Sequence, residues 1–226
     1  IVRCMPLPYD FDACNTRRAC NVIWLARDQT SRAREVLDEA SWSPATTGFP
    51  HLQHWYELRA RGELDLYERD AIDLRERHAT AIRAMTGSVL LRIQIVRCEL
   101  HWLCGRLALA STDVDVREMA RRARMLRRER IPYATLWACF LAAAVAVRMG
   151  DRAAAAAQLG VAAAIADEQQ LALYAAVAQR RLGALLAGDA GGALIAQADA
   201  FMTKQGIAKP APMCEVFAPG FGATGG

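Results

Sequence analysis

Three residues with soft ligand atoms, Cys98, His101 and Cys104, follow one another at intervals of three. Thiolates and imidazoles are the ligands that zinc and similar metal ions prefer. In a helix, however, each step of three residues drifts by about 60°, so the outer pair diverges by about 120°. A fourth ligand is also missing. We therefore interpret them as buried thiols beside a hydrogen-bonded histidine, and we predict neither a metal site nor a cofactor.

A second group that could bind a ligand is the run REMARRARMLRRER (117–130), which holds seven arginines and could bind phosphates. Met119, Ala123 and Leu126 keep helical spacing within it, which is typical of an amphipathic helix with a solvated basic face. We favour this second interpretation, because a net charge of +4 is too small to imply a nucleic-acid partner. Such a face can still meet an acidic protein surface.

Motifs for common enzymatic chemistry are missing from the sequence. A phosphate-binding loop needs Gly-Lys-Ser/Thr, and neither Lys204 nor Lys209 follows a glycine. No histidine begins the His-Arg-Asp triplet of a kinase, and no GxSxG is present. The triplet at residues 10–12, Asp-Phe-Asp, lacks the glycine of the kinase metal-binding motif, so we interpret it as chance. The sequence therefore indicates a segment without enzymatic activity.

A set of aromatic and charged residues is a better candidate for binding. Aromatic and arginine side chains in a groove are the usual anchors for a peptide. The aromatic members recur at similar levels of successive helices, and the charged members form a heptad-spaced stripe on an otherwise apolar helix. The aromatic residues also fit an ordinary core. The candidate protein-binding residues are Arg92, Glu99, Trp102, Arg106, Trp137 and Tyr174.

The elements that would position these residues are predicted from an internal repeat. Turn-like aspartates stand at 28, 70, 113, 151 and 189, in steps of 42, 43, 38 and 38 residues. Gly150-Asp151 and Gly188-Asp189 each read as a glycine that ends one helix and an aspartate that caps the next. Such a period indicates stacked helix pairs.

We therefore predict an all-α, tetratricopeptide-like α-solenoid of about five antiparallel helix hairpins over residues 1–221. The second hairpin is expected to divide at Gly62, into helices over 50–61 and 63–84. The units are longer than the roughly 34 residues of the standard repeat and lack its signature, so a ten-helix globular bundle remains the alternative. The predicted hairpins are 12–41, 50–84, 89–130, 132–168 and 170–204.

The proline-punctuated end of the chain is predicted to form a cap over residues 207–221. A short helix after Pro210 and Pro212 would carry apolar residues, and Pro219-Gly220 would stop it. We expect this cap to pack on the helices over 170–187 and 190–204, since a terminal repeat must cover its open face. Residues 222–226 are expected to be a disordered tail. The expected cap contacts are Met213, Val216, Phe217 and Phe221.

Composition favours a folded cytoplasmic protein. Of the 226 residues, 54% are hydrophobic and 23% are charged, which excludes a disordered chain. Seven cysteines with no CxxC pair fit reduced thiols better than disulfides. No apolar run reaches the roughly 18–20 residues of a membrane helix, and no signal peptide is evident. The first residue is Ile, which suggests a piece of a longer protein.

Residues 62–221 resemble the C-terminal region of large multidomain bacterial serine/threonine kinases, best known from myxobacteria. The resemblance lies in SVLLRIQIVRCELHWLCGRLAL (88–109), residues 127–155, residues 171–202 and QGIAKPAPMCEVFAPGF (205–221). In that family a kinase domain and an ATPase module precede a tetratricopeptide-like array. The resemblance implies a regulatory or partner-binding role and transfers no catalytic residue.

Two functions follow from these observations. The first is a non-catalytic interaction region of a signalling kinase–ATPase, which binds a protein or peptide, such as the kinase or ATPase segments of its own parent chain. The second is the ligand-sensing helical array of an ATPase-type transcription regulator. Neither involves a membrane or nucleic acid at this segment.

Overall fold

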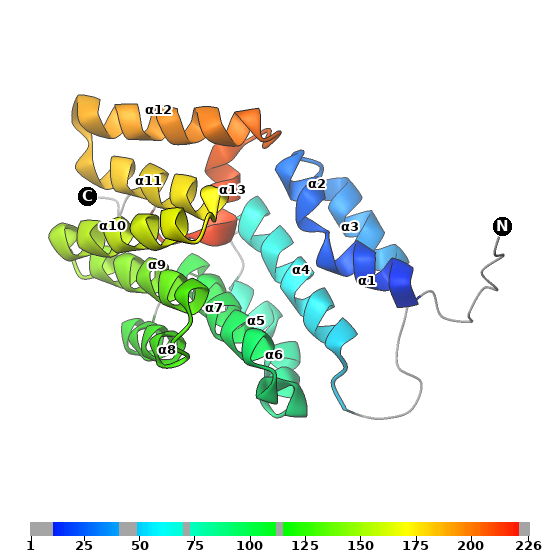
Figure 1. Cartoon of the computed structure of the whole chain (residues 1–226). Helices are drawn as coiled ribbons and strands as arrows, with labels where there is room; N and C mark the ends of the chain where they lie inside the picture. The colour runs from blue at the N-terminus through cyan, green and yellow to red at the C-terminus, as the bar shows by residue number, and fades with distance from the viewer. Residues whose placement is uncertain (1–10, 41–48, 70–72, 112–114, 222–226) are drawn as a thin grey trace.

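A computed structural model of the chain describes residues 11–40, 49–69, 73–111 and 115–221. Within these ranges the regular structure is entirely helical, with thirteen α-helices and one 3-10 helix (η1) (Figure 1). The predicted all-α fold is confirmed. The elements are α1 (Phe11–Ala19), α2 (Val22–Ala26), α3 (Thr30–Glu39), α4 (Leu52–Glu68), α5 (Leu74–Arg77), α6 (Ala79–Thr86), η1 (Val89–Arg92), α7 (Gln94–Ala110), α8 (Val116–Arg128), α9 (Pro132–Arg148), α10 (Arg152–Glu168), α11 (Ala172–Leu186), α12 (Gly188–Lys204) and α13 (Pro210–Phe217).

Consecutive helices pack on one another through most of the chain, as a solenoid requires. The contacts are most extensive from α8 to α12, where each helix lies against the next. The helix α8 departs from the common direction, since Figure 1 shows it nearly end-on while α9 and α10 run across the view. The helices α7 and α8 contact each other less than the later helix pairs do.

The helix α4 continues through Gly62, so the predicted break at this glycine is wrong. Gly62 is buried, and a Cβ atom there would lie 3.0 Å from Leu103 Cδ1 on α7. The glycine therefore lets two helices approach closely, and the packing gain outweighs its low helix propensity. The second half of this hairpin is made by the short helices α5 and α6.

The turn aspartates have different roles at different repeats. Asp151 caps α10 as predicted, because its side chain accepts a 2.9 Å hydrogen bond from Ala154 N, and Gly150 has φ of +79°. The predicted cap at Asp189 is wrong, since α12 already begins at Gly188 and Ala187 occupies the capping position. Positions 70 and 113 lie outside the described residues, and the observed caps of α5 and α8 are Asp73 and Asp115.

The helices α11 and α12 approach each other at two facing glycines. A Cβ atom on Gly183 would lie 2.6 Å from the carbonyl oxygen of Gly191, which no side chain tolerates. Small residues at this crossing bring the two backbones together and bury the interface without large side chains. The last hairpin is therefore a tightly packed unit.

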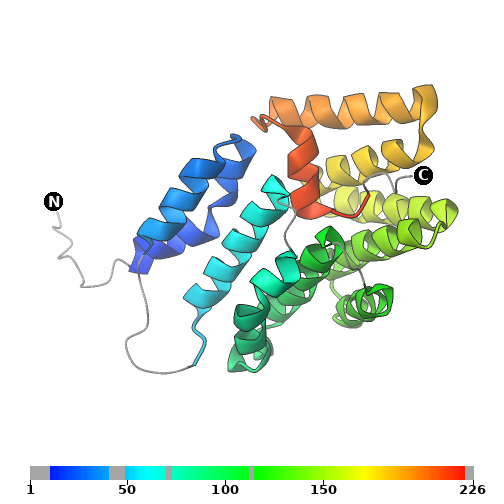
Figure 2. The same cartoon turned by 180° about the vertical axis from the view of Figure 1, so that it is seen from behind.

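The expected C-terminal helix is present as α13 and contacts α11 and α12 as predicted, but its most extensive contact is with α4. Figures 1 and 2 both show it between α4 and α11, and it contacts α4 more extensively than α11 or α12. The exposed side of α12 needs little cover, because its members are small or polar, such as Ala193, Ala196 and Gln197. We call the surface that α13 covers, formed by α4, α7, α9 and α11, the concave face.

Candidate protein-binding site

Aromatic side chains from α7, α9 and α11, the first helices of three successive hairpins, meet on the concave face. The rings of Trp102 on α7 and Trp137 on α9 are stacked, with centroids 4.5 Å apart and planes 2° apart. The Tyr174 ring on α11 lies 5.9 Å from that of Trp102. Both indoles are buried, at 4% and 6% exposure. The prediction that these three residues share one level is confirmed, and the burial of both indoles agrees with the alternative interpretation that they belong to the core.

The ring of Phe217 on α13 completes this aromatic cluster. Its centroid lies 5.3 Å from that of Tyr174, edge to face, and 6.2 Å from that of Trp102. Such arrangements are favourable beyond simple burial, because the positive edge of one ring meets the negative face of another. The Phe217 ring is therefore part of the same buried aromatic cluster as Trp102, Trp137 and Tyr174.

Arg106 holds the backbone of α13 next to this cluster. The residue is 1% exposed, and its Nη1 donates a 2.7 Å hydrogen bond to the carbonyl of Val216. Its guanidinium carbon lies 3.8 Å from the ring centroid of Trp102, and Nη2 lies 3.5 Å from Glu63 Oε1. Burial lowers the pKa of Arg106, while the carboxylate of Glu63 opposes this effect. The aromatic face, the carboxylate and the carbonyl together compensate a fully buried cation.

The carboxylate of Glu215 on α13 is bound by arginines from two helices. Its Oε1 lies 2.9 Å from Arg181 Nη2 on α11 and 3.5 Å from Arg69 Nη1 at the end of α4. Glu215 and Arg181 are both buried, so water screens this pair little. A buried ion pair therefore holds Glu215, two residues before Phe217, against α11.

The segment that leads into α13 is attached to the first hairpin. The amide of Ala208 donates a 2.7 Å hydrogen bond to the carbonyl of Ala26, and Lys209 Nζ lies 2.7 Å from Asp28 Oδ2. The hydroxyl of Tyr67 on α4 donates to the other oxygen of Asp28, at 2.9 Å. The hydrogen bonds from Lys209 and Tyr67 hold the pKa of Asp28 below its ordinary value against the effect of burial. The tail thus joins the first hairpin to the last.

Some donors on the concave face find no acceptor in α13. The indole N–H of Trp102 and the Nε–H groups of Arg106 and Arg181 are buried and lack a hydrogen-bond partner among the described residues. Arg181 Nη2 lies 2.9 Å from Glu215 Oε1, but this contact is an ion pair without hydrogen-bond geometry. A buried donor without an acceptor costs roughly 1–3 kcal/mol. The tail therefore fits the face in shape and charge but leaves part of its hydrogen-bonding capacity unused.

Two of the predicted binding residues lie outside this cluster. Glu99 binds residues of α4, since it accepts hydrogen bonds from Trp55 Nε1 and Arg59 Nη1, both at 3.0 Å, and so ties α7 to α4. Arg92 is exposed on η1, which is separate from α7. The predicted stripe through Arg92, Glu99 and Arg106 is therefore not continuous, because the helix begins only at residue 94.

Two residues of this site were not predicted from the sequence. They are Arg181, which pairs with Glu215, and Glu63, which pairs with the buried Arg106. Arg181 follows Tyr174 by seven residues on the same helix, and Arg106 follows Trp102 by four. Both spacings place an arginine on the face of the preceding aromatic residue. That recurrence was a usable signal. Glu63 offered none, because its partner lies 43 residues away in sequence.

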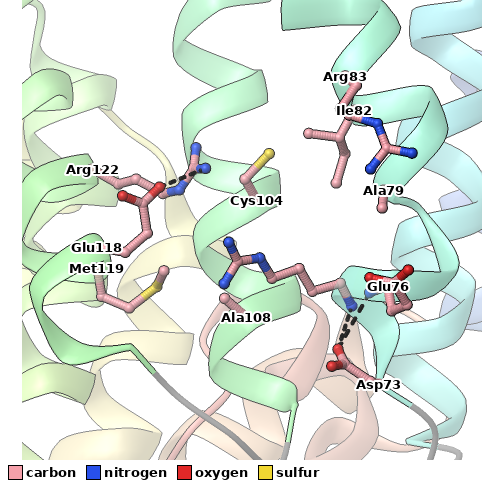
Figure 3. Close-up of a pocket in the computed structure, with 11 residues that line it drawn as sticks. Asp73, Glu76, Ala79, Ile82, Arg83, Cys104, Ala108, Glu118, Met119 and Arg122 are labelled. Carbon is pink, nitrogen blue, oxygen red and sulfur yellow. Dashed lines mark hydrogen bonds and ion pairs between the residues drawn. The ribbon is translucent and has the colours of Figure 1, made fainter.

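A separate cavity of about 340 Å³ lies among α5, α6, α7 and α8 (Figure 3). Its lining includes arginines and acidic residues in equal number, and several of the acids are already engaged. Glu118 binds Arg122 at 2.8 Å, while Asp73 accepts hydrogen bonds from Ser111 and two backbone amides. Burial raises the pKa of the Cys104 thiol in its wall, so this thiol is neutral and a poor nucleophile near pH 7.

The three residues Cys98, His101 and Cys104 have different surroundings. Cys98 and Cys104 are both buried but belong to different core clusters, and burial raises the pKa of Cys98 to about 11. Burial also lowers the pKa of His101, whose Nδ1 lacks a hydrogen-bond partner among the described residues. Across the part of the chain that the structure describes, no group of three such residues could hold a metal ion.

The arginine-rich run forms α8 and is amphipathic, as predicted. Met119, Ala123 and Leu126 are buried on one side. At the border of this side Glu118 binds Arg121 and Arg122, at 2.7 and 2.8 Å. Part of the positive charge is thus neutralised within the helix.

The fold places the chain in the class of all-helical, solenoid-like proteins. No protein-family model matches it, and neither the curated proteins nor the solved structures include a match. Among the described residues, no helix has the length and apolar character needed to cross a membrane.

Proposed function

We propose that this chain is a non-catalytic protein-interaction region, and that its concave face binds a polypeptide segment of a partner. The observation that carries the proposal is the recognition of residues 207–217 on that face. An aromatic cluster receives the Phe217 ring, Arg106 binds a backbone carbonyl, and Arg181 binds a carboxylate. These contacts are the means by which peptide-binding surfaces achieve affinity and specificity.

The parent protein we propose is a bacterial signalling serine/threonine kinase–ATPase, with this chain as part of its C-terminal region. The support is the resemblance of residues 88–109, 127–155, 171–202 and 205–221 to that family. The partner would then be a kinase or ATPase segment of the same protein, bound in a regulatory complex in the cytoplasm.

A photo-crosslinking experiment tests the proposal. We would place benzoylphenylalanine at Tyr133, whose ring borders the aromatic cluster 5.0 Å from Trp137, or at Val161, which is exposed on α10. Each full chain would be mixed with purified kinase and ATPase segments of the parent. We expect a crosslink from Tyr133 and little from Val161. A crosslink from Val161 alone, or none from either position at micromolar concentrations, would contradict the proposal.

The alternative function, a ligand-sensing helical array, has one supporting observation, the cavity among α5, α6, α7 and α8. Its volume of about 340 Å³ lies at the lower end of the range for small-molecule sites. Its charged lining would suit a small ligand with both positive and negative groups. If this alternative holds, such ligands would raise the melting temperature, and Arg122→Ala would abolish that effect.

A further inference from the structure

We infer that residues 207–217 are an internal ligand of the concave face, which a partner segment of the same chemistry displaces. That segment is a short helix with a carboxylate side chain followed two residues later by an aromatic ring. The inference deepens the proposed partner-binding function and rests on it. The tail would then regulate access to the site.

The chemistry of the partner follows from the fixed positions of the receptor groups. Arg181 is buried on α11 and reaches the tail's carboxylate at 2.9 Å. Arg106 is buried on α7 and binds the backbone carbonyl of Val216, the residue after that carboxylate. The aromatic cluster contacts the ring of Phe217, one residue further on. A segment without the carboxylate would leave Arg181 as an uncompensated buried charge, which is strongly unfavourable.

The helix of the tail has little stability of its own, although its residues 213–217 are buried against the rest of the chain. The helix α13 has only eight residues, and the side chain of Lys209 at its N-cap forms no capping hydrogen bond. Helices this short are unstable alone, so α13 depends on its contacts with the face. Those contacts leave the Trp102 indole N–H and the Arg106 Nε–H without acceptors. A partner that supplies acceptors there would bind more tightly than the tail does.

A hinge separates the tail from α12. Gly206 has φ of +84°, and the amides of Gly206 and Ile207 donate to Thr203 and Met202 in the last turn of α12. These bonds end the helix without using any residue after 207. Because α12 also packs closely on α11, the tail can leave while the last hairpin stays folded.

Release of the tail would also remove contacts at the N-terminal end of the array. The bonds from Ala208 to Ala26 and from Lys209 to Asp28 hold the turn between α2 and α3. Both would break when the tail leaves. Partner binding on the concave face would therefore increase the mobility of the first hairpin.

The test uses the full chain and a synthetic peptide of residues 207–221 with Ser in place of Cys214. On α13, Cys214 is 0% exposed and burial raises its pKa to about 11, so alkylation of this thiol reports opening of the tail. We expect saturating peptide to accelerate Cys214 alkylation on the order of tenfold. The matched control is Cys98, which is equally buried but lies on α7, and its rate should not change. A second peptide, with Glu215→Gln and Phe217→Ser, should have no effect.

A tail variant of the full chain provides the complementary measurement. Glu215→Gln with Phe217→Ser weakens the internal ligand, so a fluorescent wild-type peptide should bind this variant on the order of tenfold more tightly than it binds the wild-type chain. Equal affinity for both chains, or binding that leaves Cys214 alkylation unchanged, would overturn the inference. If the variant does not fold, the alkylation experiment on the wild-type chain decides alone, and an unchanged Cys214 rate at saturating peptide overturns the inference.

The same variant separates failure of this inference from failure of the proposed function. If the variant and the wild-type chain bind the kinase–ATPase segments equally, the partner-binding function holds and displacement of the tail is overturned. If the variant binds the peptide more tightly but binds no parent segment, the internal ligand is supported and the proposed partner is wrong.

Discussion

The side chain of Arg106 on α7 donates a 2.7 Å hydrogen bond to the carbonyl of Val216 on α13, although 110 residues separate the two in sequence. The bond forms in a site that is almost without water, since Arg106 is 1% exposed and Val216 is fully buried. It places the Phe217 ring against Tyr174 and Trp102. The tail is therefore attached to the concave face by a polar contact as well as by apolar packing.

Loss of the Arg106 cation is expected to lower the free energy of unfolding. Arg106→Met keeps much of the side-chain volume but leaves Glu63 and the Val216 carbonyl without their partner, so we expect a loss of about 3–5 kcal/mol in the free energy of unfolding. Chemical denaturation measures it. The double variant Arg106→Met/Glu63→Leu removes both charges and should recover part of the loss. A loss below about 1 kcal/mol in the single variant would contradict the pairing.

The two phenylalanines of the tail are expected to differ. Phe217 is buried in the aromatic cluster, so Phe217→Ala should cost about 3–5 kcal/mol and shift tryptophan fluorescence to longer wavelength as Trp102 becomes exposed. Phe221 is only partly buried, with its ring 5.3 Å from the guanidinium of Arg181. Phe221→Ala should therefore cost clearly less. Equal effects of both changes on stability would show that the cluster does not select Phe217.

The close approach of α11 and α12 can be tested with a matched pair of glycines. Gly183→Ala places a methyl group 2.6 Å from the Gly191 carbonyl, so the helices must separate and the thermal unfolding midpoint should fall. Gly192→Ala is the control, because no atom lies within 4 Å of its added methyl group and the residue is exposed. It should stabilise the chain by about 0.5–1 kcal/mol through helix propensity. Equal effects would contradict the close crossing.

Attachment of the tail to the first hairpin is expected to weaken in acid. The folded state depresses the pKa of Asp28, chiefly through the hydrogen bond from Lys209. The stabilisation is therefore present above the unfolded pKa of about 3.9 and is lost as the pH falls below it through the folded value. We expect the amide of Ala208 to exchange faster over that range. In Asp28→Asn this acid-induced increase in exchange should be absent. An increase of the same size in that variant would show that other carboxylates cause it.

Much of the architecture was determined by the sequence itself. The period of turn aspartates predicted helix pairs, and the spacing of Met119, Ala123 and Leu126 predicted the buried side of α8. The prolines and the Pro219-Gly220 stop predicted a short helix near 210–217. These predictions succeeded because helix formation, capping and amphipathicity depend on residues within one or two turns of each other.

The location of the tail was decided only by the tertiary structure. The sequence predicted that the apolar residues of 207–221 would pack on the helices over 170–187 and 190–204. The tail helix α13 does contact α11 and α12, but its more extensive contact with α4 was not predicted. The exposed side of α12 is small and polar, whereas the concave face presents aromatic rings and the cations Arg106 and Arg181, which need partners. Those partners, Val216 and Glu215, come together with them only after α4, α7 and α11 have stacked. Glu63 and the packing role of Gly62 depend on the same stacking, so no pattern along the chain encodes them.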